Sequence, residues 1–460
     1  MYANPIDLHQ DLKTLLENLP LKDALMGLYY ETDLNLRWAN SNLTSNGSGA
    51  HFNLLLTLIT KESKVAHTSI NASILTPSSL TKLVDSLYEE ALLAPVTEHT
   101  TFPQLTPPST YPTSFISLSA DSLSSLTHHL GREFSLTTKD TAHHFGYAEL
   151  HLAQSWIFSL SGNTLYQEEK TGRLELQLRD YPRSAWVGIN TTDFTSLNYP
   201  ALFEELHSKL ALQNNFIPTP PGKYTVILTP GATADLFNDF AYALGENDAF
   251  DGTSPFSAPN GKTRLGEKLS SLPINIYSDP SNPYSSESPY LINFTPSREE
   301  LLADNFKTIR PTYWLKDGTL NALANNSLSA STHQTQFTPD QESLIMELPG
   351  SDKTLSQLIS ETSDGLLIDC LWYIRSVDEQ AILTTGLTRD GVYLIKDGVI
   401  VGSTNNFRFN ESPLQILQKI RSVGKTELAQ PRECAETLSK FAMPPLVVEN
   451  FNLSSISESI

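Results

Sequence analysis

The sequence predicts an α+β fold in which antiparallel strands form sheets and amphipathic helices pack against them. Two β-rich runs within residues 392–401 flank an Asp397-Gly398 turn, which is typical of a tight hairpin. Apolar and polar residues alternate from Leu34 to Trp38, as they do in a half-buried strand. Apolar residues also recur at helical spacing between Ile6 and Leu16. Together these patterns favour separate helices and antiparallel sheets.

The first hundred residues alternate between predicted helices and strands. After the first helix, a strand is expected to begin over Ala24–Tyr30. We expect Asn46-Gly47 to form the turn of a hairpin whose second strand covers Phe52–Ile59. A helix is predicted over residues 79–93, with Ser79 as its N-cap, because its apolar residues share one face.

The next segment changes composition. Residues 102–114 are rich in Pro, Thr and Ser, which indicates a linker or an extended crossing segment. A helix is predicted over residues 120–134. Residues 142–178 then alternate strongly around a Ser161-Gly162-Asn163 turn, which predicts an antiparallel meander. A helix over residues 202–212 completes this half of the chain.

A second change of composition marks a domain boundary. Proline and glycine punctuate the chain from Pro218 to Gly222. A buried strand is predicted over Tyr224–Leu228, and a helix with an apolar stripe follows from Gly231 to about Leu244. We therefore divide the chain into an N-terminal α/β domain, residues 1–215, and a C-terminal domain, residues 216–460.

Composition excludes several classes of protein. The net charge of −20 argues against the basic surface that binding to phosphate backbones needs, so we expect no direct contact with nucleic acid. Two cysteines, Cys370 and Cys434, form no disulfide framework and indicate a reducing compartment. The sequence has neither a signal-peptide pattern nor an apolar run long enough to span a bilayer. We expect a cytoplasmic protein that does not contact membranes.

Residues 372–413 carry the most specific signal. They read WYIRSVDEQAILTTGLTRDGVYLIKDGVIVGSTNNFRFNESP. This run resembles the C-terminal signature of the TldD/PmbA family, the metallopeptidase-related "modulators of DNA gyrase", and in particular its PmbA (TldE) branch. The stretch from Leu34 to Gly47 resembles the N-terminal pattern of the same family. The resemblance implies a C-terminal, mainly antiparallel β domain with a barrel-like core.

The resemblance also identifies a missing metal site. Catalytic members of the family carry His-Glu-x-x-x-His on the helix that here follows Pro230-Gly231, and two imidazoles on that helix hold zinc. The matching positions in this chain are Asn238, Asp239 and Ala243. The register does not matter, because no histidine occurs from Ser208 to Thr332. We therefore expect no cofactor in this chain, and the resemblance places zinc in a TldD-like partner.

Other metal and catalytic sites are weakly supported. His144, Glu149 and His151 could converge on neighbouring strand positions, although core or surface histidines are the simpler interpretation. Cys434 lies roughly where catalytic relatives have a cysteine that binds the metal, but a small buried residue is the simpler interpretation. We interpret Cys370 in the same way. No Gly-x-Ser-x-Gly, P-loop or dinucleotide-binding pattern is present. We assign no metal ligands and no catalytic residues.

A cluster of polar residues marks the strand ends of the C-terminal signature. A network of ion pairs and amides that supports the fold is one interpretation, and a surface that contacts a peptide or a second subunit is the other. The residues that we consider for such contact are Arg389, Asp390, Arg408, Asn410 and Glu411.

The resemblance implies a function. It predicts a TldE/PmbA-like subunit of a TldD/TldE-type metalloprotease that acts on unfolded or leader peptides. This chain would bind peptide and help to form the chamber, and a TldD-like partner in a heterodimer would hydrolyse it. Two alternatives stay open: a homodimeric, non-enzymatic binding or scaffold protein, and a divergent metallohydrolase with a relocated metal site. Fold-level resemblance to a peptidase does not by itself establish peptidase activity.

Overall fold

The computed structural model describes residues 2, 5–98, 100–105, 115–137, 142–285, 287–293, 302–433 and 440–458. Its helices and mainly antiparallel sheets confirm the α+β prediction. Two sequence-based assignments fall outside these ranges: Cys434, and residues 106–114 of the expected crossing segment. Within the described part of the chain, no helix has the length and apolar character needed to cross a membrane.

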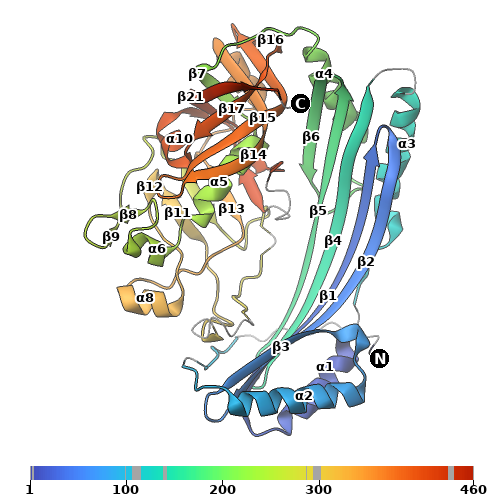
Figure 1. Cartoon of the computed structure of the whole chain (residues 1–460), viewed down its shortest axis with the longest axis vertical. Coiled ribbons are helices and arrows are strands. Elements are labelled where there is room, and N and C mark those ends of the chain that lie inside the picture. The colour runs from blue at the N-terminus through green and yellow to red at the C-terminus, as the bar shows by residue number, and fades with distance from the viewer. Residues whose placement is uncertain are drawn as a thin grey trace.

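A six-stranded sheet, here called the N-terminal sheet, runs along one side of the molecule (Figure 1). Its strand order is β3-β2-β1-β4-β5-β6, and all neighbours are antiparallel. Buried and more exposed residues alternate along the second half of β1, whereas part of β1 and the end of β4 are buried on both faces. Their bounds are β1 (Leu21–Ala39), β2 (Asn42–Thr60), β3 (Val65–Asn71), β4 (His143–Ser159), β5 (Thr164–Asp180) and β6 (Arg183–Asn190).

The predicted turn at Asn46-Gly47 is wrong. The chain reverses at Asn40 and Ser41, which both have positive φ angles of 51° and 57°. Asn is among the few residues that adopt this left-handed conformation readily, so an Asn-Ser pair can replace the more familiar Asn-Gly. Gly47 lies instead within β2, opposite Asn35, whose amide nitrogen would be 2.9 Å from a Cβ at that position. The glycine is therefore explained by close packing across the strands.

Four helices cover one face of the N-terminal sheet (Figure 1). The helices α1 and α2 pack at one end, and α3 and α4 pack at the other. The capping residue of α2 is Thr76 rather than the expected Ser79, which occupies the third helical position and completes a capping box. The helix bounds are α1 (Pro5–Glu17), α2 (Pro77–Leu93), α3 (Ser124–Thr137) and α4 (Tyr199–Leu212).

The C-terminal part contains a strand circuit, here called the C-terminal barrel. Strands pair in the order β14-β7-β21-β17-β15, and a further pairing of β14 with β15 closes the circuit into a partial barrel. Strand β16 extends it, and the β15–β16 hairpin turns at Asp397 and Gly398 as predicted. The bounds are β7 (Gly222–Leu228), β14 (Asp364–Asp378), β15 (Leu383–Lys396), β16 (Val399–Ser403), β17 (Asn406–Glu411), β18 (Ile420–Val423) and β21 (Leu446–Ser457).

A second C-terminal sheet lies beside the barrel, and helix α5 (Pro230–Tyr242) is buried between them. Thr229 caps α5, and Pro230 opens it, which is the expected use of proline at a helix start. Leu236, Phe237 and Phe240 pack into the largest hydrophobic core. The remaining bounds are β10 (Asn275–Ser278), β11 (Thr312–Lys316), β12 (Thr319–Leu320), β13 (Leu344–Glu347), β19 (Glu427–Leu428), β20 (Phe441–Met443), α6 (Glu246–Asp251), α8 (Ser327–His333), α9 (Leu355–Ser360) and α10 (Pro413–Lys419).

Candidate functional site

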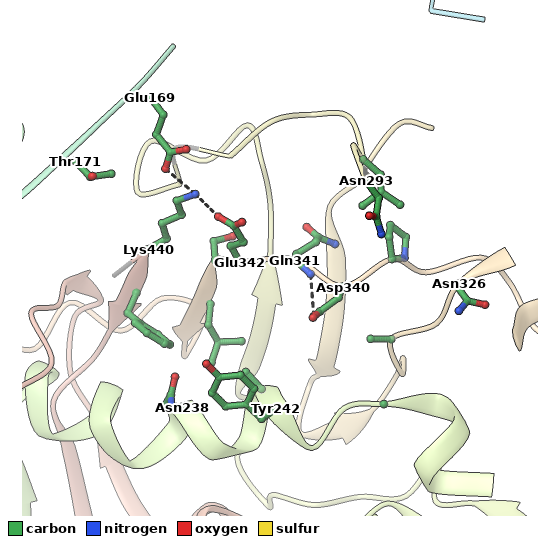
Figure 2. A pocket seen from close by; sticks show the side chains of 18 of the residues that line it. Glu169, Thr171, Asn238, Tyr242, Asn293, Asn326, Asp340, Gln341, Glu342 and Lys440 are labelled. Carbon is green, nitrogen blue, oxygen red and sulfur yellow. Dashed lines mark hydrogen bonds and ion pairs between the residues drawn. The ribbon is translucent and has the colours of Figure 1, made fainter. Parts of the chain in front are cut away.

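A cleft of about 1290 Å³ separates the N-terminal sheet from α5 and the second C-terminal sheet. One wall comes from β1, β2, β4 and β5, and the other from α5, α6 and the segment 339–344. Figure 2 shows Glu169 and Thr171 of the first wall opposite Asn238 and Tyr242 of the second. Lys440 spans the two walls, since its ammonium group lies 2.8 Å from Glu169 of β5 and also pairs with Glu342. The cleft therefore lies between parts of the chain that are far apart in sequence.

The cleft is strongly acidic. Lys440 is the only lysine or arginine among the described residues that line it. Burial disfavours its charged form, but Glu169 and Glu342 raise the pKa of Lys440 above its ordinary value. Burial also raises the pKa of the Asp340 carboxyl. The lining carboxylates belong to Glu31, Asp33, Glu169, Glu246, Asp248, Asp340 and Glu342. This excess of negative charge favours a ligand that carries positive charge.

Helix α5 presents a polar and an aromatic side chain to the cleft. Asn238 lies one helical turn before Tyr242, so both residues occupy the same face of the helix (Figure 2). Tyr242 is 72% exposed, which is unusual for an aromatic side chain within a concave site. An exposed ring of this kind provides contact area for a ligand at low entropic cost. Sequence reasoning missed Tyr242, although its spacing of four residues from Asn238 is a sequence signal.

The positions that match the zinc helix of catalytic relatives do not fit a zinc ion. Asn238 reaches the cleft but offers only an amide. Asp239 does not line the cleft, and burial raises the pKa of its carboxyl. Ala243 is the C-cap of α5 and packs against the hydrophobic core. A zinc site needs imidazole, thiolate or carboxylate donors that converge, so this helix face provides no such set.

The alternative trio of His144, Glu149 and His151 is divided by the pleat of β4. Glu149 and His151 share the cleft face, and His151 Nε2 lies 3.4 Å from Glu149. Glu149 also pairs with Arg173 at 2.6 Å. His144 is an odd number of residues away, so it lies on the helix-covered face, against Phe134 and Phe203. The three residues therefore do not converge.

Asp390, one of the residues considered for external contact, is buried and has its partners within the chain. Gln177 Nε2 donates a hydrogen bond of 2.7 Å to Asp390, Ser184 donates another, and Arg432 forms an ion pair at 2.9 Å. Gln177 and Ser184 belong to the N-terminal sheet, so Asp390 joins this sheet to the barrel. Arg389 lies beside it, with its guanidinium over the ring of Trp372. These contacts favour the structural interpretation for both residues.

The other three residues of that group lie on β17. Glu411 is buried and pairs with Lys419 of α10 at 2.9 Å, and it also accepts a hydrogen bond from the Asn452 backbone. Asn410 pairs with β15 in the barrel and is half-buried. Arg408 is exposed, so it keeps the character of a surface contact residue. The structure thus separates the five residues into the half-buried Arg389 and the buried Asp390 on β15 and a set of three on β17.

Comparison with known proteins identifies the family. The family model described as the PmbA/TldA metallopeptidase C-terminal domain matches residues 221–455. The chain belongs to the TldD/PmbA family. The resemblance stated from residues 372–413 is thereby confirmed. A search of curated protein sequences found no match.

Solved structures share the fold of this TldD/PmbA family member along nearly its whole length. TldE from Thermococcus kodakarensis aligns with a TM-score of 0.76 and 17% identity, covering 96% of this chain and 99% of that chain. A proposed modulator of a DNA gyrase from Thermotoga maritima aligns with a TM-score of 0.73 and 16% identity, and the alignment covers 97% of this chain and 99% of that chain. A second proposed modulator of DNA gyrase, from Bacteroides thetaiotaomicron, aligns with a TM-score of 0.74 and 14% identity, and the alignment covers 98% of this chain and 99% of that chain. At these identities the likeness concerns the fold.

Proposed function

We propose that this chain is a TldE-like subunit that binds an unfolded peptide in the acidic cleft, while a zinc-bearing TldD-like partner hydrolyses it. Family membership supports a metallopeptidase-related role. One observation carries the finer proposal: α5 presents Asn238 and Tyr242 to the cleft, where catalytic relatives carry a zinc-binding helix. The helix is thus suited to contact a peptide without activating water on a metal.

The dimensions and polarity of the cleft support a peptide ligand. Its volume exceeds the roughly 300–1,000 Å³ of most small-molecule sites, which leaves room for an extended chain segment. Amide side chains along it, among them Asn238, Asn293 and Gln341, are of the type that both donates to and accepts from a peptide backbone. The excess of lining carboxylates favours peptides that carry lysine or arginine.

The division of labour is tested by reconstitution. The purified full-length chain, a zinc-loaded TldD-like protein, and a mixture of the two are each incubated with an unstructured, lysine-rich peptide that carries a fluorophore and a quencher at its two ends. We expect cleavage by the mixture to exceed that by the TldD-like protein alone, and we expect none from this chain alone. Size-exclusion chromatography of the mixture should give a particle that contains both chains.

Two outcomes would contradict the proposal. Cleavage by this chain alone that a chelator abolishes would indicate a metallohydrolase with its own metal site. A stable homodimer that neither binds the TldD-like protein nor changes its activity would indicate a scaffold or binding protein.

A further inference from the structure

Three potential metal ligands meet on the helix-covered side of the N-terminal sheet, away from the cleft. Glu133 comes from α3, His144 from β4 and His207 from α4. His207 Nε2 lies 2.6 Å from Glu133 Oε1, and His144 Nε2 lies 3.8 Å from the same oxygen. One donor atom from each residue lies within 4.8 Å of the other two. None of these residues lines the acidic cleft.

His144 has an unused nitrogen that points into this group. Its side chain is 1% exposed, and its Nε2 atom has no hydrogen-bond partner among the described residues. A buried polar atom without a partner destabilises the fold, so such an atom in a folded chain calls for an explanation. An imidazole nitrogen that carries no proton donates its lone pair to a metal ion, so this buried atom is placed to act as a ligand.

We propose that Glu133, His144 and His207 bind a divalent transition-metal ion, for which Zn²⁺ is the best match. Two imidazoles and one carboxylate form a common ligand set for zinc, whereas Ca²⁺ and Mg²⁺ prefer oxygen ligands alone. Ligands at 2.0–2.1 Å from a tetrahedral ion lie about 3.3 Å from one another. The distances from Glu133 Oε1 to the two histidine nitrogens, 2.6 Å and 3.8 Å, lie on either side of that value. The side chain of His207 is half-exposed, so it can move to bring its nitrogen to the required distance.

Solvent reaches the group from the protein surface. Glu133 and His207 line a surface cavity of about 370 Å³ together with Arg132, Phe203 and Glu204. A metal ion bound by three side chains would therefore have room for a water ligand on this side. Because the ligands come from α3, β4 and α4, the ion would also hold both helices against the sheet. Metal binding is thus expected to stabilise the folded chain.

Zinc titration of the tag-free, full-length chain tests the proposal. Isothermal titration calorimetry with ZnCl₂ should give one site, and zinc should raise the midpoint of thermal unfolding. His207→Ala and Glu133→Gln should each weaken zinc binding by at least about 100-fold, because changing even an outer-shell group costs 10–100-fold. His67→Ala, on an exposed position of β3, is the matched control and should bind zinc as the wild type does.

A ligand exchange separates coordination from a merely structural role. His207→Cys replaces one zinc donor by another, so it should restore binding that His207→Ala loses, and with Co²⁺ it should show thiolate-to-metal charge-transfer absorption. The proposal is overturned if the wild-type chain binds no zinc at micromolar concentration. It is equally overturned if His207→Ala and Glu133→Gln bind zinc as tightly as the wild type, since the group would then be an ion pair only.

Discussion

Replacing Asp390 by alanine is expected to lower the free energy of unfolding by about 3–5 kcal/mol, the loss typical when one partner of a buried ion pair is removed. Asp390 is 2% exposed and accepts from Gln177 and Ser184 while it pairs with Arg432. Without the carboxylate, the largely buried Arg432 guanidinium loses its ion-pair partner. The N-terminal sheet and the barrel would also lose a shared acceptor.

The surroundings of Arg432 make this loss difficult to compensate. Its guanidinium lies between the rings of Trp186 and Trp372, at 5.0 and 5.5 Å from their centroids. Its backbone nitrogen donates to Asp235 of α5 at 3.0 Å, which fixes the course of the chain. The guanidinium is only 9% exposed, so it gains little further hydration unless the loop or the indole rings move. Asp390 balances a charge that the rest of the fold keeps in place.

Denaturant unfolding measures the effect, with tryptophan fluorescence as the signal because two indoles contact Arg432. Asp364→Ala is the matched control: Asp364 pairs with Lys396 at 2.7 Å, but both side chains are at least half exposed. That control should lose only about 0–1 kcal/mol. Adding Arg432→Met to Asp390→Ala should recover part of the loss, because both charges are then gone. If the Asp390 and Asp364 variants lose equal free energies of unfolding, the buried ion pair of Asp390 does not stabilise the fold as proposed.

The elements whose signals are local can be predicted from the sequence. The Asp397-Gly398 hairpin and the helix after Pro230 depend on residues within a few positions of one another, and the structure has both. The hairpin at Asn40 and Ser41 is missed because Asn46-Gly47 carries a stronger turn signal than the pair that turns. Gly47 instead lies opposite Asn35 in the paired strand, a contact between strands that a local turn pattern does not reveal.

The candidate sites depend on contacts across long stretches of chain, which local sequence patterns do not encode. Lys440 joins Glu169 across the cleft, and His144 meets Glu133 and His207 from three separate elements. Neither group leaves a spacing motif. One part does follow from the sequence: strand alternation places His144 on the opposite face from Glu149 and His151. Strand alternation alone therefore shows that these three residues do not form one site.

Replacing Tyr242 by alanine is expected to weaken binding of a cationic peptide by about 30-fold, which corresponds to about 2 kcal/mol for the loss of an aromatic hot spot. This prediction depends on the proposed peptide site. Tyr242 is the exposed aromatic residue that α5 presents to the cleft, and its ring does not belong to the hydrophobic cores. Its removal should therefore leave the stability of the fold nearly unchanged while it removes contact area from the ligand.

Fluorescence anisotropy of a fluorescein-labelled, lysine-rich, unstructured peptide measures the affinity. Tyr181→Ala is the matched control. Tyr181 is 83% exposed, belongs to the turn that joins β5 to β6, and does not line the cleft. The wild-type affinity should also fall as salt is added, because the lining carboxylates attract the peptide through screened charges. If both tyrosine variants bind the peptide as the wild type does, the peptide does not lie against α5. If binding is also insensitive to salt, the acidic lining does not select the ligand.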